Sequence, residues 1–252
     1  MKVYFVGAGP GDPELLTVKA YNLLRTCRFV IYAGSLISSE ALDLVPSDAE
    51  KHDSAKLDLE EIKQLFLEAK RRDVDVVRLH SGDPSIYGAI REQMNILDDL
   101  EIEYTVIPGV SSFQAAAAVL RTELTVPEHS QTIILTRTSG RTPMPARQEL
   151  EILGQSRATL CIFLSAHKLE PVAATLSKHY GPQCPAAVVY KASWPDQIVV
   201  TGTLADISSK AAAAGITKTA MIIVGEALSR NVPPSKLYDP TFTHKYRLGK
   251  ES

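Results

Sequence analysis

A glycine-rich turn near the start of the chain is the first segment whose residue types could hold a ligand. Gly7, Gly9 and Gly11 alternate directly after a short apolar run, where a dinucleotide-binding fold places its phosphate-binding turn. The pattern departs from that fingerprint because Asp12 replaces the third glycine and Pro10 has no amide proton to donate. The next apolar run also ends without the acidic residue that would hold a ribose. These departures argue against an NAD(P)-linked oxidoreductase. The glycines could equally form a tight turn that binds no ligand and needs glycine only for its backbone conformation, so this alternative stays open.

Three further loops combine glycine or proline with polar residues, and each follows an apolar run. They are residues 81–87, 108–112 and 136–145. The first two also match ordinary helix starts, with a proline in the first turn or a serine as the cap. The third contains Arg137 and Arg141, whose planar guanidinium groups are of a type that suits carboxylates. Arginines in a loop are also often merely solvated, so that interpretation stays open.

The elements that must position these loops alternate between short apolar runs and segments of helical period. Strands are expected at residues 3–6, 29–32, 74–79, 104–107, 132–135, 159–164, 187–190, 198–200 and 221–224. Helices are expected at about residues 16–27, 59–72, 86–97, 112–120, 146–153, 169–178 and 204–214. The alternation predicts an α/β fold with parallel or mixed sheets and helices on both faces. Ligands bind at the carboxyl ends of strands in such folds, and the four loops fall there.

The chain is expected to form two domains joined by a short linker. Residues 122–130 show no clear period and contain a proline, so they separate an N-terminal α/β domain, 1–121, from a C-terminal α/β domain, 131–228. Residues 229–252 form a polar C-terminal tail, which predicts a surface arm.

Composition narrows the classes of protein that fit. With 27 basic and 29 acidic residues among 252, the net charge is −2, which gives no basic excess for gripping nucleic acid. The three cysteines form no C-x-x-C pair and the six histidines no H-E-x-x-H pattern, so we expect buried, reduced thiols and no metal site. No apolar run reaches the roughly 18 residues of a membrane span, and the first run is too short for a signal peptide. We therefore expect a cytoplasmic protein with no membrane partner.

Together, these motifs resemble those of the tetrapyrrole (corrin and porphyrin) methyltransferase family. The stretches that carry the resemblance occur in the family's order over roughly residues 1–228, and they are residues 7–17, 82–84, 108–112 and 200–204. Three other stretches resemble the subgroup that methylates C-11 of precorrin-4 or cobalt-precorrin-4 in cobalamin synthesis, and they are residues 135–143, 163–166 and 190–196. The resemblance implies the two-domain α/β tetrapyrrole-methylase fold, a homodimer, and an active site in the cleft between the domains.

The resemblance also implies S-adenosylmethionine as the cofactor and S-adenosylhomocysteine as its product. Cofactor contacts are implied at Pro10, Ser81, Gly82, Asp83, Ile86, Tyr87, Ser111, Ser112, Leu164, Ala192, Ala220 and Met221. Contacts with the tetrapyrrole substrate are implied at Gly9, Gly11 and Asp12, with Arg137 and Arg141 as the candidates for its carboxylates. This chain departs from the residues that relatives often carry at Ser81, Ser111, Ser112 and Leu164.

The chemistry of methyl transfer suits residues of these types. A carboxylate or a backbone carbonyl stabilises a sulfonium, and apolar side chains such as Ile86, Leu164 and Met221 suit an adenine. Transfer to an electron-rich ring carbon depends mainly on alignment, which can contribute about 7–11 kcal/mol, so we name no general base and leave the catalytic residues unassigned. Three alternatives stay open: another tetrapyrrole methyltransferase such as one for uroporphyrinogen III, a non-catalytic module that senses the cofactor or a tetrapyrrole, and the oxidoreductase.

Overall fold

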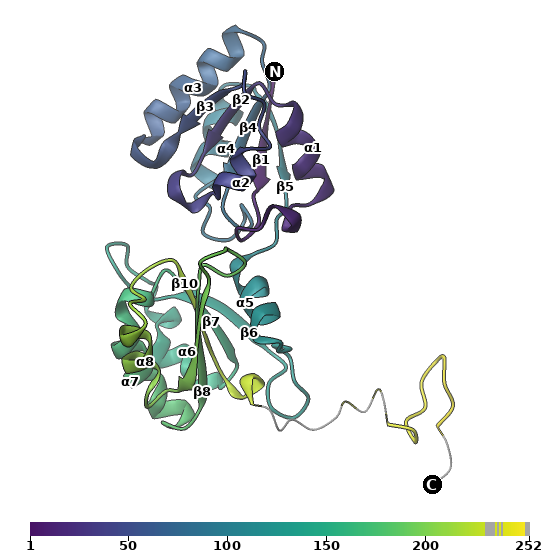
Figure 1. The fold of residues 1–252 in the computed structure, drawn as a ribbon, viewed down its shortest axis with the longest axis vertical. Coiled ribbons are helices and arrows are strands. Elements are labelled where there is room, and N and C mark those ends of the chain that lie inside the picture. Colours follow the sequence, from purple (N-terminus) through teal and green to yellow (C-terminus); the bar gives the residue numbers. More distant parts are fainter. Residues whose placement is uncertain (230–234, 236, 238, 250–252) are drawn as a thin grey trace. The chain divides into compact units, whose positions relative to one another are not determined.

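The apolar runs of the first half of the chain form a parallel five-stranded sheet (Figure 1). Its strands are β1 (Lys2–Gly7), β2 (Phe29–Tyr32), β3 (Glu50–Asp53), β4 (Val76–His80) and β5 (Glu103–Ile107), in the order β3-β2-β4-β1-β5. The largely buried strands β1, β2 and β4 read as mostly apolar runs, and the sequence predicts every strand of this sheet except β3. The parallel pairing brings the carboxyl ends of β4, β1 and β5 side by side.

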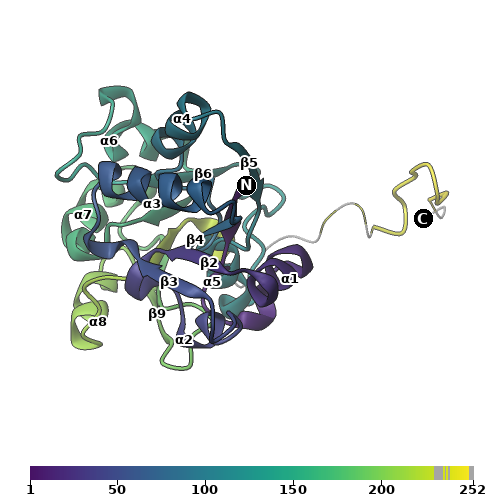
Figure 2. The ribbon, with the colours of Figure 1, turned by 90° about the horizontal axis from the view of Figure 1, so that it is seen from above.

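Helices cover both faces of this sheet, and they are α1 (Val18–Thr26), α2 (Ser39–Leu42), α3 (Leu59–Arg71) and α4 (Arg91–Asp99). A capping box begins α3, in which Asp58 and Glu61 exchange side-chain and backbone hydrogen bonds. The buried residues of α3 and α4 share an apolar cluster with Phe5, whereas those of α1 and α2 share another with Val6. Because neighbouring residues of a strand point to opposite faces, α1 and α3 lie on opposite sides of the sheet, as Figure 2 shows.

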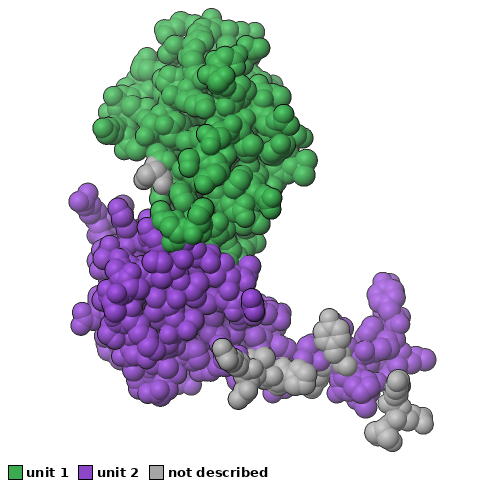
Figure 3. Space-filling model, viewed as in Figure 1, with its two compact units in different colours: residues 1–115, 191–196 green, residues 116–190, 197–252 purple. Residues whose placement is uncertain are grey.

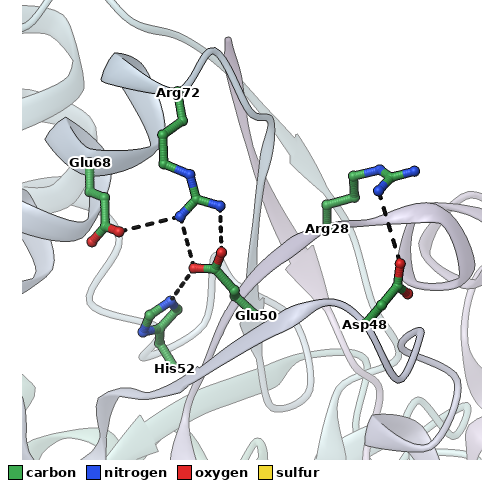
Figure 4. Close-up of polar contacts among 6 residues, drawn as sticks. All are labelled: Arg28, Asp48, Glu50, His52, Glu68 and Arg72. Atoms are coloured by element: carbon green, nitrogen blue, oxygen red, sulfur yellow. Dashed lines mark hydrogen bonds and ion pairs between the residues drawn. The ribbon is translucent and has the colours of Figure 1, made fainter.

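The edge strand β3 is polar, and no apolar run in the sequence announces it. Arg72, just after α3, forms a bidentate ion pair with Glu50 of this strand and lies 3.3 Å from Glu68 (Figure 4). The Arg72 guanidinium holds the pKa of Glu50 below its usual value. His52 stacks on Phe29 with the ring centroids 4.5 Å apart. Ion pairing and ring stacking thus hold β3 in the sheet, as apolar contacts hold the other strands.

The second sheet is mixed. Its strands are β6 (Ile133–Arg137), β7 (Thr159–Phe163), β8 (Pro185–Tyr190), β9 (Ile198–Thr203) and β10 (Ala220–Val224), in the order β6-β7-β10-β8-β9. The β6–β7 pair is parallel, and the other neighbouring pairs are antiparallel. Helices α6 (Leu150–Leu153), α7 (Leu169–Tyr180) and α8 (Ile207–Ala213) share one apolar cluster with this sheet, centred on buried residues such as Leu160, Leu176 and Ile222. The predicted α/β class is confirmed.

The computed structural model describes residues 1–229, 235, 237 and 239–249, and the chain divides into two compact units (Figure 3). The first unit contains Met1–Ala115 and Lys191–Asp196, and the second contains the other segments. The division falls inside α5 (Ser112–Leu120), whereas the sequence places a linker at residues 122–130. Because α5 continues through the point of division, the helical spacing of apolar residues is not interrupted there. The sequence pattern therefore gives no sign of the boundary between the two units.

One predicted helix begins later than the sequence indicates. The sequence predicts a helix from about residue 86, but α4 begins at Arg91. Tyr87 and Ala89 have left-handed backbone conformations, with φ of 54° and 49°, which a right-handed helix cannot contain. Residues 81–89 therefore form one long loop, and the interpretation of Pro84 as part of a plain helix start is wrong.

The cysteines follow the prediction. Cys27, Cys161 and Cys184 are buried and free of disulfides. Burial raises the pKa of Cys27 to about 11 and the pKa values of Cys161 and Cys184 to about 12, so all three are protonated thiols at neutral pH.

The C-terminal tail is described only in part. Of residues 229–252, residues 230–234, 236, 238 and 250–252 lie outside the described residues, and Pro233 and Pro234 are among them. Tyr246 and Leu248 are exposed, in agreement with a surface position for that portion. Within the described residues, no helix is long and apolar enough to cross a membrane.

Candidate active site

Three loops at the carboxyl ends of neighbouring strands meet backbone to backbone in the first unit. Gly7 ends β1, Gly82 follows β4 and Gly109 follows β5. A Cβ atom on Gly7 would lie 2.6 Å from the Cα of Gly109 and 2.6 Å from the carbonyl oxygen of Gly82. A Cβ atom on Gly109 would overlap the same oxygen. Because these obstacles are backbone atoms, no rotation of a side chain can relieve the overlap, and the loops after β1 and β5 depend on glycine where they touch.

Hydrogen bonds extend the pairing of β1 with β4 into the loops that follow them. The amide of Ala8 donates to the carbonyl of His80 at 2.7 Å. The amide of Gly82 donates to the carbonyl of Gly9 at 2.7 Å, and the amide of Gly9 donates back to Gly82 at 3.3 Å. Gly9 and Gly82 have φ of 70° and 65°, the left-handed region that glycine enters without strain. The two loops are thereby held in one fixed arrangement.

Asp83 joins two of the loops. Its Oδ1 accepts hydrogen bonds from the amide of Ser85, at 2.8 Å, and from the Ser85 hydroxyl, while its Oδ2 accepts from the amide of Gly109 at 2.9 Å. Partial burial acts to raise the pKa of Asp83, but the hydrogen bonds from Ser85 and Gly109 outweigh it, and the pKa lies below its usual value. The carboxylate is therefore charged at neutral pH, and both of its oxygens already hold the loops in place.

Two carbonyls of the glycine-rich loop, residues 7–12, accept hydrogen bonds from side chains. The indole nitrogen of Trp194 donates to the carbonyl of Pro10 at 2.7 Å, and the buried hydroxyl of Ser38 donates to the carbonyl of Gly11 at 2.6 Å. The indole also lies against Gly11, where a Cβ atom would overlap its Cδ1 and Nε1. The loop is thus held from two sides.

Two amides of the glycine-rich loop, those of Gly9 and Asp12, donate hydrogen bonds to other parts of the protein. The amide of Gly9 donates to Gly82, the amide of Asp12 donates to the hydroxyl of Ser193 at 3.1 Å, and Pro10 has no N–H. A phosphate group would have to displace these hydrogen bonds before the loop could bind it. The geometry therefore argues against the dinucleotide alternative, in agreement with the departures seen in the sequence.

Strained backbone conformations occur at two residues for which the sequence implies cofactor contacts and on either side of a third. Tyr87 and Leu164 both have φ of 54°, and their side chains are 45 % and 65 % exposed. Lys191 and Ser193 have φ of 44° and 72°, on either side of Ala192. Positive φ is uncommon for bulky residues, and such strain gathers at functional sites. Tyr87 and Leu164 thus combine an uncommon backbone conformation with an exposed position, and their contacts with a cofactor stay a prediction.

In the second unit, several predicted contact residues lie at one end of the sheet. Arg137 ends β6, Leu164 directly follows β7 and Ala220 begins β10. Because β7 is parallel to β6 and antiparallel to β10, these three positions fall at the same end. Met221, the next residue of β10, is buried, and Ala220 is half-buried. The topology therefore brings together residues that are more than 80 positions apart in the chain.

Arg137 and Arg141 differ in what they contact. The Arg137 guanidinium donates to the carbonyls of Thr138, Thr142 and Pro143, each at 3.1 Å. Arg137 therefore holds the conformation of its own loop. Arg141 is exposed near the tip of that loop, between the residues that Arg137 binds. Of the two arginines, Arg141 is the exposed one, and its contact with a substrate carboxylate stays a prediction.

The remaining residues implied as cofactor contacts lie on loops of the first unit. Ser81 and Ile86 are half-buried in the loop after β4, and Ser111 is buried before Ser112, which begins α5. Ala192 is buried in the segment Lys191–Asp196. Their contacts with a cofactor stay a prediction.

Buried ionisable groups lie on β4, next to the loop. Arg78 donates from Nε to the side-chain oxygen of Gln93 at 2.9 Å, and burial lowers its pKa to about 10. Burial, followed by the charge of Arg78, lowers the pKa of His80 to about 3, so His80 is neutral at neutral pH. Among the residues that the structure describes, no three His, Cys, Asp or Glu side chains are grouped so that they could hold a metal ion.

Sequence reasoning missed parts of this site. Gly109 lies in a recognised motif, but nothing in the sequence shows that it touches Gly7 and Gly82. Ser38 has the pattern of an ordinary helix cap, and it does accept from the amide of Ala41 at 3.3 Å. Its second bond, to the carbonyl of Gly11, depends on packing alone and leaves no local signal.

The sequence model of the family described as Tetrapyrrole (Corrin/Porphyrin) Methylases matches residues 2–208 of this chain. The chain belongs to the tetrapyrrole methylase family. The match spans most of both sheets, so it covers the loops described above in the two units.

The sequences of similar proteins match this tetrapyrrole methylase over nearly its whole length. A Pseudomonas aeruginosa protein named precorrin-4 C(11)-methyltransferase is 49 % identical, over 99 % of this chain and 100 % of that protein. A Methanocaldococcus jannaschii protein named cobalt-precorrin-4 C(11)-methyltransferase is 48 % identical, over 98 % of this chain and 96 % of that protein.

Solved structures support the tetrapyrrole methylase fold. The X-ray structure of a cobalamin biosynthetic enzyme, cobalt precorrin-4 methyltransferase, matches with a TM-score of 0.88 and 41 % identity, over 90 % of this chain and 96 % of that one. Uroporphyrin-III C-methyl transferase from Thermus thermophilus, complexed with S-adenyl homocysteine, matches with a TM-score of 0.76 and 29 % identity, over 91 % and 94 %. The fold implied by the sequence resemblance is confirmed.

Asp83 should support the site through the loops that it joins. In Asp83→Asn, an amide NH₂ group replaces one of the two oxygens that accept a backbone N–H. The substitution should therefore lower the free energy of unfolding by about 1 kcal/mol for each hydrogen bond lost. The folded-state pKa is lowered, so the carboxylate stabilises the fold above its ordinary pKa, and this stabilisation is lost as pH falls through the folded value. Urea unfolding at pH 7 and at acidic pH should show the difference between the two proteins shrinking on acidification.

Asp99→Asn is the matched control, because Asp99 is an exposed aspartate at the end of α4. It should unfold like the wild type at both pH values. A wild-type stability for Asp83→Asn at pH 7 would contradict the role given to Asp83.

Proposed function

We propose that this chain is an S-adenosylmethionine-dependent methyltransferase that methylates C-11 of precorrin-4 or cobalt-precorrin-4 in the synthesis of the corrin ring of cobalamin. The observation that carries the proposal is near-half identity, over the full length, to two proteins named for this reaction. The uroporphyrin-III C-methyl transferase, at 29 % identity, is a more distant relative. The 49 % and 48 % identities to the precorrin-4 and cobalt-precorrin-4 proteins differ too little to favour either substrate.

The residues of the first unit fit S-adenosylmethionine. The cofactor supplies an electrophilic methyl group on a positively charged sulfur, which a nearby carboxylate and backbone carbonyls stabilise. Asp83 is a charged carboxylate within the loop expected to bind it, and Ile86 and exposed Tyr87 on the same loop offer apolar surface for an adenine. The second unit would add Leu164 and Met221. A structural neighbour complexed with S-adenyl homocysteine supports this assignment.

Alignment is what this chain's residues can contribute to the reaction. The three loops at the ends of β4, β1 and β5 are fixed by backbone contacts and hydrogen bonds among themselves. A site that is fixed before ligands bind loses little freedom when they bind, and correct placement of the reacting atoms can contribute about 7–11 kcal/mol. Gly9, Gly11 and Asp12 would face the tetrapyrrole, and the exposed Arg141 would bind one of its carboxylates. This scheme needs no strongly activated acid or base.

Transfer of a labelled methyl group tests the proposed function. The purified chain should transfer the methyl group of labelled S-adenosylmethionine to precorrin-4, to cobalt-precorrin-4 or to both, and NMR of the product should place the label on C-11. Uroporphyrinogen III serves as the comparison substrate. A label found only on uroporphyrinogen III would replace the proposal by the other tetrapyrrole reaction, and binding of NADH without binding of S-adenosylhomocysteine would overturn it.

Arg141 should act on the substrate side alone. Arg141→Ala removes a bidentate contact with a carboxylate, so kcat/KM for the precorrin should fall about 10- to 100-fold, while Arg141→Lys should restore part of the loss. The affinity for S-adenosylhomocysteine, measured by calorimetry, should stay within about twofold of the wild type. Arg137→Ala should instead loosen the loop, because it frees the carbonyls of Thr138, Thr142 and Pro143.

Arg147→Ala is the control for Arg141, because Arg147 is an exposed arginine in a nearby turn. It should leave kcat/KM unchanged. Normal methylation by Arg141→Ala would mean that Arg141 is a solvated loop residue and that the carboxylates are bound elsewhere.

A homodimer is part of the proposal, as the resemblance implies. Light scattering at micromolar concentration should give twice the 27.5 kDa mass of one chain. A monomer mass would reject it. A cytoplasmic location and the absence of a nucleic-acid partner stay predictions from the sequence.

A further inference from the structure

Two neighbouring residues of the segment Lys191–Asp196 bind the glycine-rich loop. The indole nitrogen of Trp194 donates to the carbonyl of Pro10 at 2.7 Å, and the hydroxyl of Ser193 accepts from the amide of Asp12 at 3.1 Å. Both contacts span more than 180 positions of the chain. The segment therefore holds the glycine-rich loop on both sides of one residue, Gly11.

That residue, Gly11, is fixed by the same indole. A Cβ atom on Gly11 would overlap Cδ1 and Nε1 of Trp194 and would lie 2.9 Å from Cε2. The ring thus fills the space that a side chain at this position would need. Because the ring also holds the carbonyl of the preceding residue, Trp194 limits both the position and the orientation of this part of the loop.

The segment is braced internally. Lys191 Nζ lies 2.6 Å from a carboxylate oxygen of Asp196 and 4.8 Å from the centre of the Trp194 ring, within the range of a cation–π contact. Lys191 and Ser193 both have positive φ, a conformation that persists only where surrounding contacts enforce it. These contacts indicate that the indole is set in place by its own segment.

We propose that Trp194 is a positioning residue, which sets the conformation of the glycine-rich loop and through it the binding of both ligands. This inference rests on the proposed function, in which Pro10 meets the cofactor while Gly9, Gly11 and Asp12 meet the tetrapyrrole. A loop held in its binding conformation before the ligands arrive avoids the cost of being ordered by them. Trp194 should therefore affect both ligands, whereas Arg141 should affect only the substrate.

Hydrogen exchange tests the contact between Trp194 and the loop without any ligand. Trp194→Phe keeps an aromatic ring and removes the N–H that binds Pro10. In this variant, the amides of Gly9, Gly11 and Asp12 should exchange about tenfold faster than in the wild type. Ser193→Ala should speed the exchange of the Asp12 amide, and Ser209→Ala, which removes an exposed hydroxyl from α8, is the matched control. Unchanged exchange in Trp194→Phe would overturn the proposal.

Ligand binding tests the positioning role. Calorimetry should show S-adenosylhomocysteine binding about tenfold more weakly to Trp194→Phe and more weakly still to Trp194→Ala, and KM for the precorrin should rise in both variants. Trp194 is the only tryptophan of the chain, so its fluorescence in the wild type reports on this segment directly. Addition of S-adenosylhomocysteine should change the emission, because the indole donates to the carbonyl of Pro10, the residue expected to meet the cofactor.

The outcomes separate the two proposals. If the wild type binds S-adenosylhomocysteine with no change in emission and Trp194→Phe binds it within twofold, the positioning role is wrong and the proposed function stands. If the wild type does not bind it, the proposed function fails, while hydrogen exchange still decides whether Trp194 fixes the loop. If Trp194→Ala does not fold, Trp194→Phe decides the outcome.

Discussion

The candidate site depends on one steric constraint, the contact of three polypeptide backbones where Gly7, Gly82 and Gly109 meet. The contact is possible because parallel pairing ends β4, β1 and β5 at the same side of the first sheet. Once the backbones touch, their polar groups pair across the gap, and Asp83 can reach the amide of Gly109. The order of the strands thus leads directly to the arrangement of the loops.

The hydrogen bonds of the glycine-rich loop distinguish it from a phosphate-binding turn. A phosphate-binding turn keeps its amides free for the ligand, whereas here the amides of Gly9 and Asp12 and the carbonyls of Pro10 and Gly11 bind other parts of the protein. The loop gives up hydrogen bonds to a ligand and gains a fixed shape. A reaction that depends on placing a methyl donor in line with a ring carbon benefits from a fixed shape more than from additional polar contacts.

Burial determines how much of this structure the sequence can predict. The strands and longer helices appear as apolar runs and helical periods because their side chains face a core, and the two-sheet α/β class follows from that pattern. The residue types of the site were also accessible, because Asp83 and Arg137 lie in loops with unusual composition. Their partners were not, because the bond from Gly109 to Asp83 depends on strand order, and the bonds from Arg137 depend on the path of its own loop. The contact of Trp194 with the glycine-rich loop could not be predicted from the sequence either, since Pro10 lies more than 180 positions away in the chain.

The polar strand β3 has a consequence for how the protein behaves among its own copies. It forms one edge of the first sheet, where an unpaired row of amides and carbonyls could pair with a strand of another molecule. Its residues Glu50, Lys51, His52 and Asp53 place charged and polar groups along that edge, and apolar residues there would favour such pairing. The polar strand is therefore suited to ending the sheet and to keeping newly made chains from aggregating through this edge. Protection of the edge requires polar residues, so it removes the apolar pattern by which strands are usually recognised in a sequence.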